Sequence, residues 1–198
     1  MKMNLPNKLT ILRICMVPVF MIFLAAPLPL SMNVRLIVSA VIFVIASLTD
    51  MLDGKIARAR NLITDFGKFM DPLADKFLVF GALLGILVND EFAAIRSVFV
   101  WAAAIVIFRE LAVTSLRLVI AGKDGLVIAA SWLGKVKTVT QISCICCVLL
   151  EPVLFGGIGF FATYKPLTWV TMIAMIVMTL WSGIDYVKTY WKFIDPEK

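Results

Sequence analysis

The chain has 198 residues, of which 62% are apolar, and its mean hydropathy is +0.99. Soluble domains are about 45–50% apolar, so this composition excludes a soluble globular protein and indicates an integral membrane protein. The net charge of +6 does not favour nucleic-acid binding, because the hydrophobic segments leave no soluble basic module to hold a nucleic acid. We expect the basic residues to orient the chain in the membrane and to attract anionic head groups and phosphates.

Six hydrophobic segments are each long enough to cross a bilayer as a helix. They are Leu9–Leu28, Val34–Leu52, Phe69–Val88, Ser97–Val119, Trp132–Phe155 and Leu167–Val187. The connections between them are short, so the sequence predicts a single all-α membrane domain over residues 1–198 with six transmembrane helices. The first segment shows no small-residue cleavage pattern, so we expect it to remain as a transmembrane helix.

The positions of Lys and Arg predict how the chain is oriented. If the amino terminus is cytoplasmic, only Arg35, Arg96 and Lys165 of the 19 Lys and Arg residues lie in outside loops. Basic residues concentrate on the cytoplasmic side of membrane proteins, so this orientation is favoured. It places residues 50–75 at the cytoplasmic ends of the second and third helices.

Four aspartates stand at the edges of the second and third segments: Asp50, Asp53, Asp71 and Asp75. The first two are three residues apart and the last two are four apart, so each pair projects from one face of a helix. A turn between the pairs would let them converge; its residues include Asn61, Thr64, Asp65 and Gly67. An aspartate at membrane depth costs about 2.5–3.5 kcal/mol, and four together repel one another unless cations lie between them. Two bound Mg²⁺ or Mn²⁺ ions would account for the cluster, and the alternative is simple loop charges at helix ends.

The spacing of this stretch is Asp50-x-x-Asp53-Gly54-x-x-Ala57-Arg58, eight residues, then Gly67-x-x-x-Asp71-x-x-x-Asp75. At every fixed position it resembles the signature of the CDP-alcohol phosphatidyltransferase family of membrane enzymes. The resemblance implies a helical bundle with a cytoplasm-facing active site, in which the small residues make room for the CDP moiety. It also implies that the last aspartate is the base, and that the protein is a homodimer, as family members commonly are. The chain contains no histidine, so a base must in any case be a carboxylate, a lysine or a tyrosine.

The entry to the first helix carries Asn7, Thr10 and Arg13. Asn7 or Thr10 could cap the helix. The alternative is a role in binding the CDP-lipid, because the Asn-x-x-Thr-x-x-Arg pattern resembles the branch of the family that uses glycerol 3-phosphate. The predicted CDP-lipid residues are Asn7, Thr10, Gly54, Ala57, Arg58 and Gly67.

The fourth segment carries Arg109, Glu110 and Arg117. Counted from Ser97, only twelve residues precede Arg109, too few to cross the membrane. The helix must therefore continue, and these charges lie within the membrane or close to it. Arg109 and Glu110 can form a buried structural pair or bind substrate. Arg117 has no adjacent acid in the sequence, which favours a phosphate as its partner.

The fifth segment begins with a polar face of Gly134, Thr138 and Gln141, flanked by Lys135 and Lys137. Two lysines beside inward-facing polar residues favour a polar pocket over simple anchoring at the membrane surface. The predicted acceptor-phosphate residues are Arg109, Arg117, Lys135, Lys137, Thr138 and Gln141.

Two other groups of residues carry no predicted chemistry. Tyr186, Lys188, Tyr190, Trp191 and Lys192 at the end of the sixth segment are interpreted as an interfacial aromatic and basic belt. The cysteines match no zinc pattern and are interpreted as small packing residues; they are Cys15, Cys144, Cys146 and Cys147.

The sequence therefore predicts an enzyme that transfers a phosphatidyl group from CDP-diacylglycerol to an anionic acceptor. The resemblance names glycerol 3-phosphate as that acceptor, with phosphatidylglycerophosphate and CMP as products. Inositol phosphate, serine and phosphatidylglycerol remain as alternative acceptors. A divalent-cation or proton transporter with intramembrane carboxylates is the hypothesis from another class, and a structural scaffold is a third.

Overall fold

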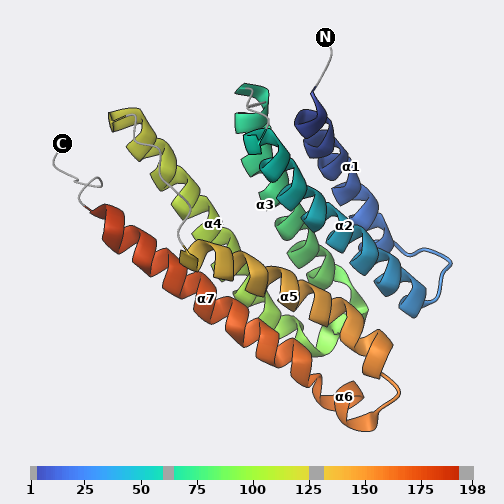
Figure 1. Ribbon diagram of the computed structural model, residues 1–198. Coiled ribbons are helices and arrows are strands. Elements are labelled where there is room, and N and C mark those ends of the chain that lie inside the picture. The colour runs from blue at the N-terminus through green and yellow to red at the C-terminus, as the bar shows by residue number, and fades with distance from the viewer. Residues whose placement is uncertain (1–3, 60–64, 125–131, 192–198) are drawn as a thin grey trace.

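The computed structural model describes residues 4–59, 65–124 and 132–191, without the side chains of 51–59 and of a few other helical positions such as Asp71. In these ranges all regular structure is helical (Figure 1). The helices are α1 (Leu5–Ala25), α2 (Met32–Ala59), α3 (Asp65–Val88), the short 3-10 helix η1 (Asp90–Ile95), α4 (Arg96–Asp124), α5 (Trp132–Phe155), α6 (Gly159–Tyr164) and α7 (Pro166–Tyr190). Each of the six predicted segments lies largely in one of the six long helices of the described residues, and η1 and α6 were not predicted.

The bounds of α1 differ from the prediction at both ends. The helix begins at Leu5, with Pro6 in the first turn, where a missing N–H costs nothing. It ends at Ala25 and not at Leu28, because Ala26 precedes a proline and adopts the extended conformation that this position favours.

Five stretches of helix are long and apolar enough to cross a membrane, judged over the part of the chain that the structure describes. They are Asn7–Ala25, Met32–Asp50, Asp90–Ile120, Trp132–Phe155 and Gly159–Tyr190. The sixth long helix, α3, is not among them, and its first half carries Asp71, Asp75 and Lys76. The protein is thus an all-helical, multi-pass membrane protein.

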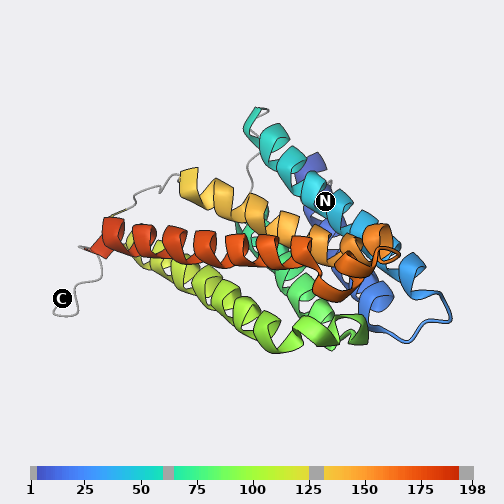
Figure 2. The same cartoon turned by 90° about the horizontal axis from the view of Figure 1, so that it is seen from below.

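The long helices run up and down, so their ends gather on two sides of the bundle (Figures 1 and 2). The first residues of α1 and α3 and the last residues of α2 and α4 lie on the upper side of Figure 1. The connection between α1 and α2, together with η1 and α6, lies at the opposite end. The polar residues predicted for the site on these helix ends therefore lie toward one side of the bundle.

Close packing of α1 against α3 sets how these two helices meet. A Cβ atom added at Gly81 would lie 2.9 Å from Val17 Cγ1, and one at Gly85 would lie 2.6 Å from Leu24 Cδ2. Small residues allow close helix contact in membranes, where packing drives association. Asp75 lies on α3 before these glycines, so the same contact brings it toward the first turns of α1.

The end opposite the aspartates is stabilised by its three basic residues. Arg35 donates from Nε to the Phe23 carbonyl oxygen (3.1 Å) and from Nη2 to that of Leu24 (3.0 Å), so it caps the end of α1. Arg96 Nη2 lies 2.8 Å from Asp90 Oδ1, and Lys165 Nζ donates to the Glu91 carbonyl oxygen at 3.1 Å. The three basic residues that were predicted to face outside therefore share one end of the bundle.

A buried carboxylate on α5 caps α7 at this same end. Glu151, which is 2% exposed, accepts the backbone N–H of Leu167 on Oε1 (2.9 Å) and that of Thr168 on Oε2 (2.7 Å). These N–H groups are first-turn donors without an intrahelical partner, and a negative charge there is stabilised by the helix dipole. Glu151 therefore fixes where α7 begins relative to α5.

Candidate active site

A polar stripe on α1 faces the interior of the bundle. Asn7 and Thr10 are buried, and Arg13 is completely so. The Asn7 N–H donates to Asn4 Oδ1 at 3.0 Å, so Asn4 is the helix cap. The interpretation of Asn7 or Thr10 as the cap is wrong, because both lie inside the helix with buried side chains.

The first of the four aspartates contacts this stripe. Arg13 Nη1 lies 2.6 Å from Asp50 Oδ1, which joins α1 to α2. Arg13 is 0% exposed and Asp50 is 41% exposed, so the carboxylate lies at the boundary between the interior and the surroundings. The sequence analysis gave Arg13 no role, although its spacing from Asn7 and Thr10 already placed it on their face.

The four aspartates are carried by two neighbouring helices. Asp50 and Asp53 lie in α2, and Asp71 and Asp75 lie in α3, whose first residue is Asp65. Gly67 is a buried helical residue, not part of a turn. The predicted turn residues Asn61 and Thr64 lie outside the described residues, as do the side chains of Asp53, Gly54, Ala57, Arg58 and Asp71. Convergence of the four carboxylates stays a prediction.

Asp75 lies among charged side chains from several helices. Its carboxylate interacts electrostatically with Lys137 of α5 and Glu110 of α4. Lys76 and Arg13 also act on it. Asp75 is therefore the point where α1, α3, α4 and α5 bring their charges together.

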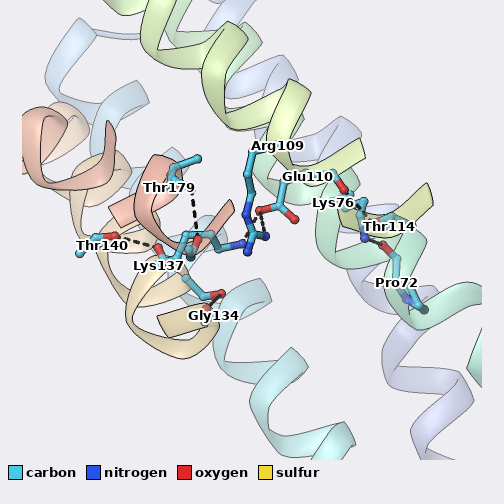
Figure 3. Close-up of polar contacts among 11 residues, drawn as sticks. Pro72, Lys76, Arg109, Glu110, Thr114, Gly134, Lys137, Thr140 and Thr179 are labelled. Carbon is cyan, nitrogen blue, oxygen red and sulfur yellow. Dashed lines mark hydrogen bonds and ion pairs between the residues drawn. The ribbon is translucent and has the colours of Figure 1, made fainter. Parts of the chain in front are cut away.

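Glu110 is the centre of a buried ion cluster (Figure 3). Lys137 Nζ makes a close ion pair with Glu110 Oε1, and Arg109 Nη1 lies 3.3 Å from the same oxygen. Breaking a buried pair leaves an uncompensated charge, so this cluster ties α4 firmly to α5. Arg109 and Glu110 do form the buried pair that was one of the two open alternatives, and Lys137 is the member that sequence analysis did not connect to it.

The described residues of α5 divide into an inward and an outward set. Lys137 and Gln141, four residues apart, are buried, whereas Lys135 is exposed. Thr138 donates to the Gly134 carbonyl oxygen of its own helix at 3.1 Å. The inward face of α5 is thus set by Lys137 and Gln141.

The Gln141 amide is a candidate donor to a ligand. Its Nε2 is buried and has no hydrogen-bond partner among the residues that the structure describes. A buried donor left without a partner costs about 1–3 kcal/mol. A ligand oxygen at this position would remove that cost.

The end of α7 contacts Arg109 and Arg117 of α4. The Arg117 guanidinium carbon lies 5.5 Å from the centroid of the Tyr186 ring, and Tyr186 is buried. A Cβ atom at Gly183 would lie 3.1 Å from Arg109 Cγ. Assigning Tyr186 to an interfacial belt is therefore wrong, because its ring points inward. The helical spacing of Thr179, Ser182 and Tyr186 was the available signal, and all three are buried.

An apolar groove of about 650 Å³ lies between α4 and the last turns of α7. Arg109, Gly183 and Trp191 are among the residues that line it. Arg109 therefore lines the groove and also belongs to the ion cluster around Glu110.

The donor set is suited to a hard divalent cation. Asp50 and Asp75 offer carboxylate oxygens, the ligands that Mg²⁺ and Mn²⁺ prefer. Among the side chains that the structure describes, no three of the types His, Cys, Asp and Glu come together. The side chains of the other two predicted ligands, Asp53 and Asp71, lie outside the described residues.

The four cysteines carry free thiols. Cys144 is buried within the hydrophobic core, together with apolar residues of the other helices. This agrees with the interpretation of Cys144 as a packing residue, whereas Cys15 is exposed.

The chain is similar to known proteins over most of its length. Residues 3–181 match the family model described as CDP-alcohol phosphatidyltransferase. The chain is 42% identical over 197 residues to the CDP-diacylglycerol–glycerol-3-phosphate 3-phosphatidyltransferase of Bacillus subtilis, with 96% of each chain covered. It is 36% identical to the protein of the same name from Escherichia coli K12, covering 94% of each chain. It is also 38% identical to a probable phosphatidylglycerophosphate synthase of Mycobacterium tuberculosis H37Rv, covering 93% of this chain and 80% of that protein.

Proposed function

Because the chain belongs to the CDP-alcohol phosphatidyltransferase family, we propose that it transfers a phosphatidyl group from CDP-diacylglycerol to sn-glycerol 3-phosphate. The products are phosphatidylglycerophosphate and CMP. The observation that carries the proposal is the 42% identity to the Bacillus subtilis protein of that activity over nearly the whole of both chains. Proteins with the same name from other bacteria match over 195 residues.

The proposed architecture is one domain with six transmembrane helices and a cytoplasm-facing site in the cell membrane. The three basic residues at the opposite end, Arg35, Arg96 and Lys165, support this orientation. In the proposal α3 is the sixth span, and its aspartates lie at the cytoplasmic end. Two copies of the chain would form a homodimer.

The family generally uses divalent metals, and we assign two Mg²⁺ or Mn²⁺ ions to Asp50, Asp53, Asp71 and Asp75. When bound, such cations neutralise the diphosphate of the donor and the charge on the departing CMP. The proposed CDP-lipid residues remain Asn7, Thr10, Gly54, Ala57, Arg58 and Gly67. The buried positions of Asn7 and Thr10, on the face that also holds Arg13, support their part in this set.

The acceptor is proposed to bind on the other side of Asp75, among cations from α4 and α5. The proposed set is Arg109, Arg117, Lys135, Lys137, Thr138 and Gln141. Lys137 and Gln141 are the best supported members, because both are buried and Gln141 offers an amide donor with no partner in the described structure. Glu110 holds Lys137 and Arg109 in place between the two helices.

The chemistry assigned to the side chains is a general-base reaction. Asp75 takes the proton from the acceptor hydroxyl, and the resulting oxygen attacks the lipid-side phosphorus of the donor. The bond from that phosphorus to the CMP oxygen breaks as the new bond forms. The buried cations beside Asp75 hold the acceptor phosphate in reach of the donor.

An assay of detergent-purified protein tests the proposal directly. With CDP-diacylglycerol and Mg²⁺ present, we expect release of CMP that depends on glycerol 3-phosphate. Release that depends instead on inositol phosphate, serine or phosphatidylglycerol would replace the acceptor. Divalent-cation or proton flux into proteoliposomes without any CDP-lipid, together with no CMP release, would favour a transporter.

A further inference from the structure

Arg109 and Arg117 of α4 differ from the other cations of the site, because α7 contacts both of them. We infer that Gly183 and Tyr186 are positioning residues of the acceptor site, which hold Arg109 and Arg117 for the phosphate of the acceptor. The inference rests on the proposed function. It gives α7, to which no chemistry was assigned from the sequence, a part in acceptor specificity.

Gly183 determines where the Arg109 side chain can lie. A Cβ atom at this position would approach Arg109 Cγ to 3.1 Å, closer than an ordinary van der Waals contact. The head of the same side chain is held by Glu110, with Nη1 at 3.3 Å from Oε1. Arg109 is therefore fixed at its stem by α7 and at its head by α4, which removes most of its conformational freedom.

Tyr186 holds Arg117 without neutralising it. The guanidinium lies 5.5 Å from the ring centroid, in the range of a cation–π contact. The ring is itself held against Tyr190, with centroids 4.7 Å apart. A carboxylate partner would cancel the charge of Arg117, whereas an aromatic ring leaves that charge available to an anion.

The charge balance of the group matches a phosphate monoester. Arg109, Arg117 and Lys137 carry three positive charges, and Glu110 carries one negative charge, so the four side chains have a net formal charge of +2. A phosphate monoester carries about −1.5 to −2 at neutral pH. Without Tyr186 and Gly183 the same charges would be present, but their geometry would be free to vary.

Two variants with matched controls test the inference. Tyr186→Leu removes the ring, and Gly183→Ala displaces the Arg109 stem. Tyr164→Leu and Gly157→Ala are the controls, because Tyr164 is exposed and a Cβ at Gly157 has no neighbour within 4 Å. All four proteins are compared by steady-state kinetics with CDP-diacylglycerol and glycerol 3-phosphate varied separately.

We expect Tyr186→Leu to raise the KM for glycerol 3-phosphate about tenfold, with the KM for CDP-diacylglycerol unchanged. Gly183→Ala raises the same KM several-fold, Tyr186→Phe keeps it near the wild-type value because the ring remains, and both controls leave it unchanged. An unchanged KM for glycerol 3-phosphate in Tyr186→Leu and Gly183→Ala would refute the inference, and so would an equal rise in both KM values. If Tyr186→Leu does not fold, the two glycine variants decide the question.

The same experiment distinguishes a failure of the proposed function from a failure of this inference. If the wild-type protein does not use glycerol 3-phosphate at all, the acceptor assignment is wrong whatever the variants do. If it does use it, and the α7 variants retain the wild-type KM, only the role of α7 is wrong.

Discussion

At the scale of single residues, the charged side chains of this protein differ in the partners that they contact. Glu110 shares one oxygen between Lys137 and Arg109, and Asp50 contacts the fully buried Arg13. Asp75 has nearby charges of both signs from α1, α4 and α5. Because Asp75 is acted on by side chains of α1, α4 and α5 and Asp50 forms an ion pair with Arg13, the two carboxylates should differ in what their loss removes.

Replacing Asp75 should separate chemistry from binding. Asp75→Asn keeps the shape of the side chain but cannot accept the proton, so we expect kcat to fall about 10²–10⁴-fold with CDP-lipid binding largely kept. Asp50→Asn should weaken metal and CDP-lipid binding more strongly. Turnover assays and nucleotide binding by titration measure the difference. Equal loss of nucleotide binding in both variants would contradict Asp75 as the base.

Removing the shared carboxylate of Glu110 should destabilise the protein. Glu110→Gln leaves Lys137 and Arg109 buried without their anion, and we expect about 3–5 kcal/mol lower stability. The control is Asp90→Asn, because the Asp90–Arg96 pair is exposed and such pairs contribute only about 0–1 kcal/mol. Unfolding in detergent measures both, and similar effects of the two substitutions would show that the Glu110 cluster is not a structural tie.

At the scale of elements, α7 depends on side chains of other helices at both of its ends. Glu151 of α5 caps its first turn, and its last turns meet Arg109 and Arg117 of α4. A shift at the first end would move the second, since a helix transmits displacement along its length. The capping contact is therefore expected to affect the proposed acceptor site, although it lies at the far end of the bundle.

The cap itself can be tested by substitution. Glu151→Ala leaves the N–H groups of Leu167 and Thr168 without acceptors, and we expect stability to fall by about 1–3 kcal/mol. Glu151→Gln retains one acceptor oxygen and should lose less. Thermal unfolding of the two variants measures the order of the effects. A Gln variant as unstable as the Ala variant would mean that charge at the helix dipole, not hydrogen bonding, accounts for the stabilisation.

At the scale of the whole molecule, the bundle has a structural end and an end to which the proposed function assigns the chemistry, the chemical end. Arg35, Arg96 and Lys165 bond to backbone or to acids at the structural end, whereas Asp50 and Arg13 lie toward the other. Substrates of opposite character must meet at the chemical end, since the donor is a lipid and the acceptor is soluble. A site at one end of a membrane bundle is open to both phases.

This division predicts the orientation of the chain. Single cysteines at Lys8 and Asp90, both exposed and at opposite ends, are introduced into a chain whose own four cysteines are replaced. A thiol reagent that does not cross membranes should label Asp90→Cys on intact cells, and Lys8→Cys only after the membrane is opened. The reverse pattern would place the aspartates at the outer face and would remove the proposed cytoplasmic site.

By itself, the sequence determined the class, the number of long helices and the family, because these depend on local properties. Hydrophobic runs specify helices in a bilayer, and the Asp–Gly–Arg spacing is a linear signal that needs no fold to be read. Helical spacing also indicated which faces of α1 and α5 are polar. It could not indicate that η1 and α6 are helical, because both are too short for a periodic pattern to stand out.

Only the tertiary structure decided which side chains the charged residues contact. Lys137 and Glu110 are 27 residues apart, and Arg117 and Tyr186 lie on helices separated by α5 and α6, so no spacing rule connects them. Glu151 was equally invisible as a cap, since its acceptor role depends on where α7 starts in space. Charges buried in a bundle find their counterparts through helix packing, and packing is set by side-chain shape across the whole chain rather than by neighbours in sequence.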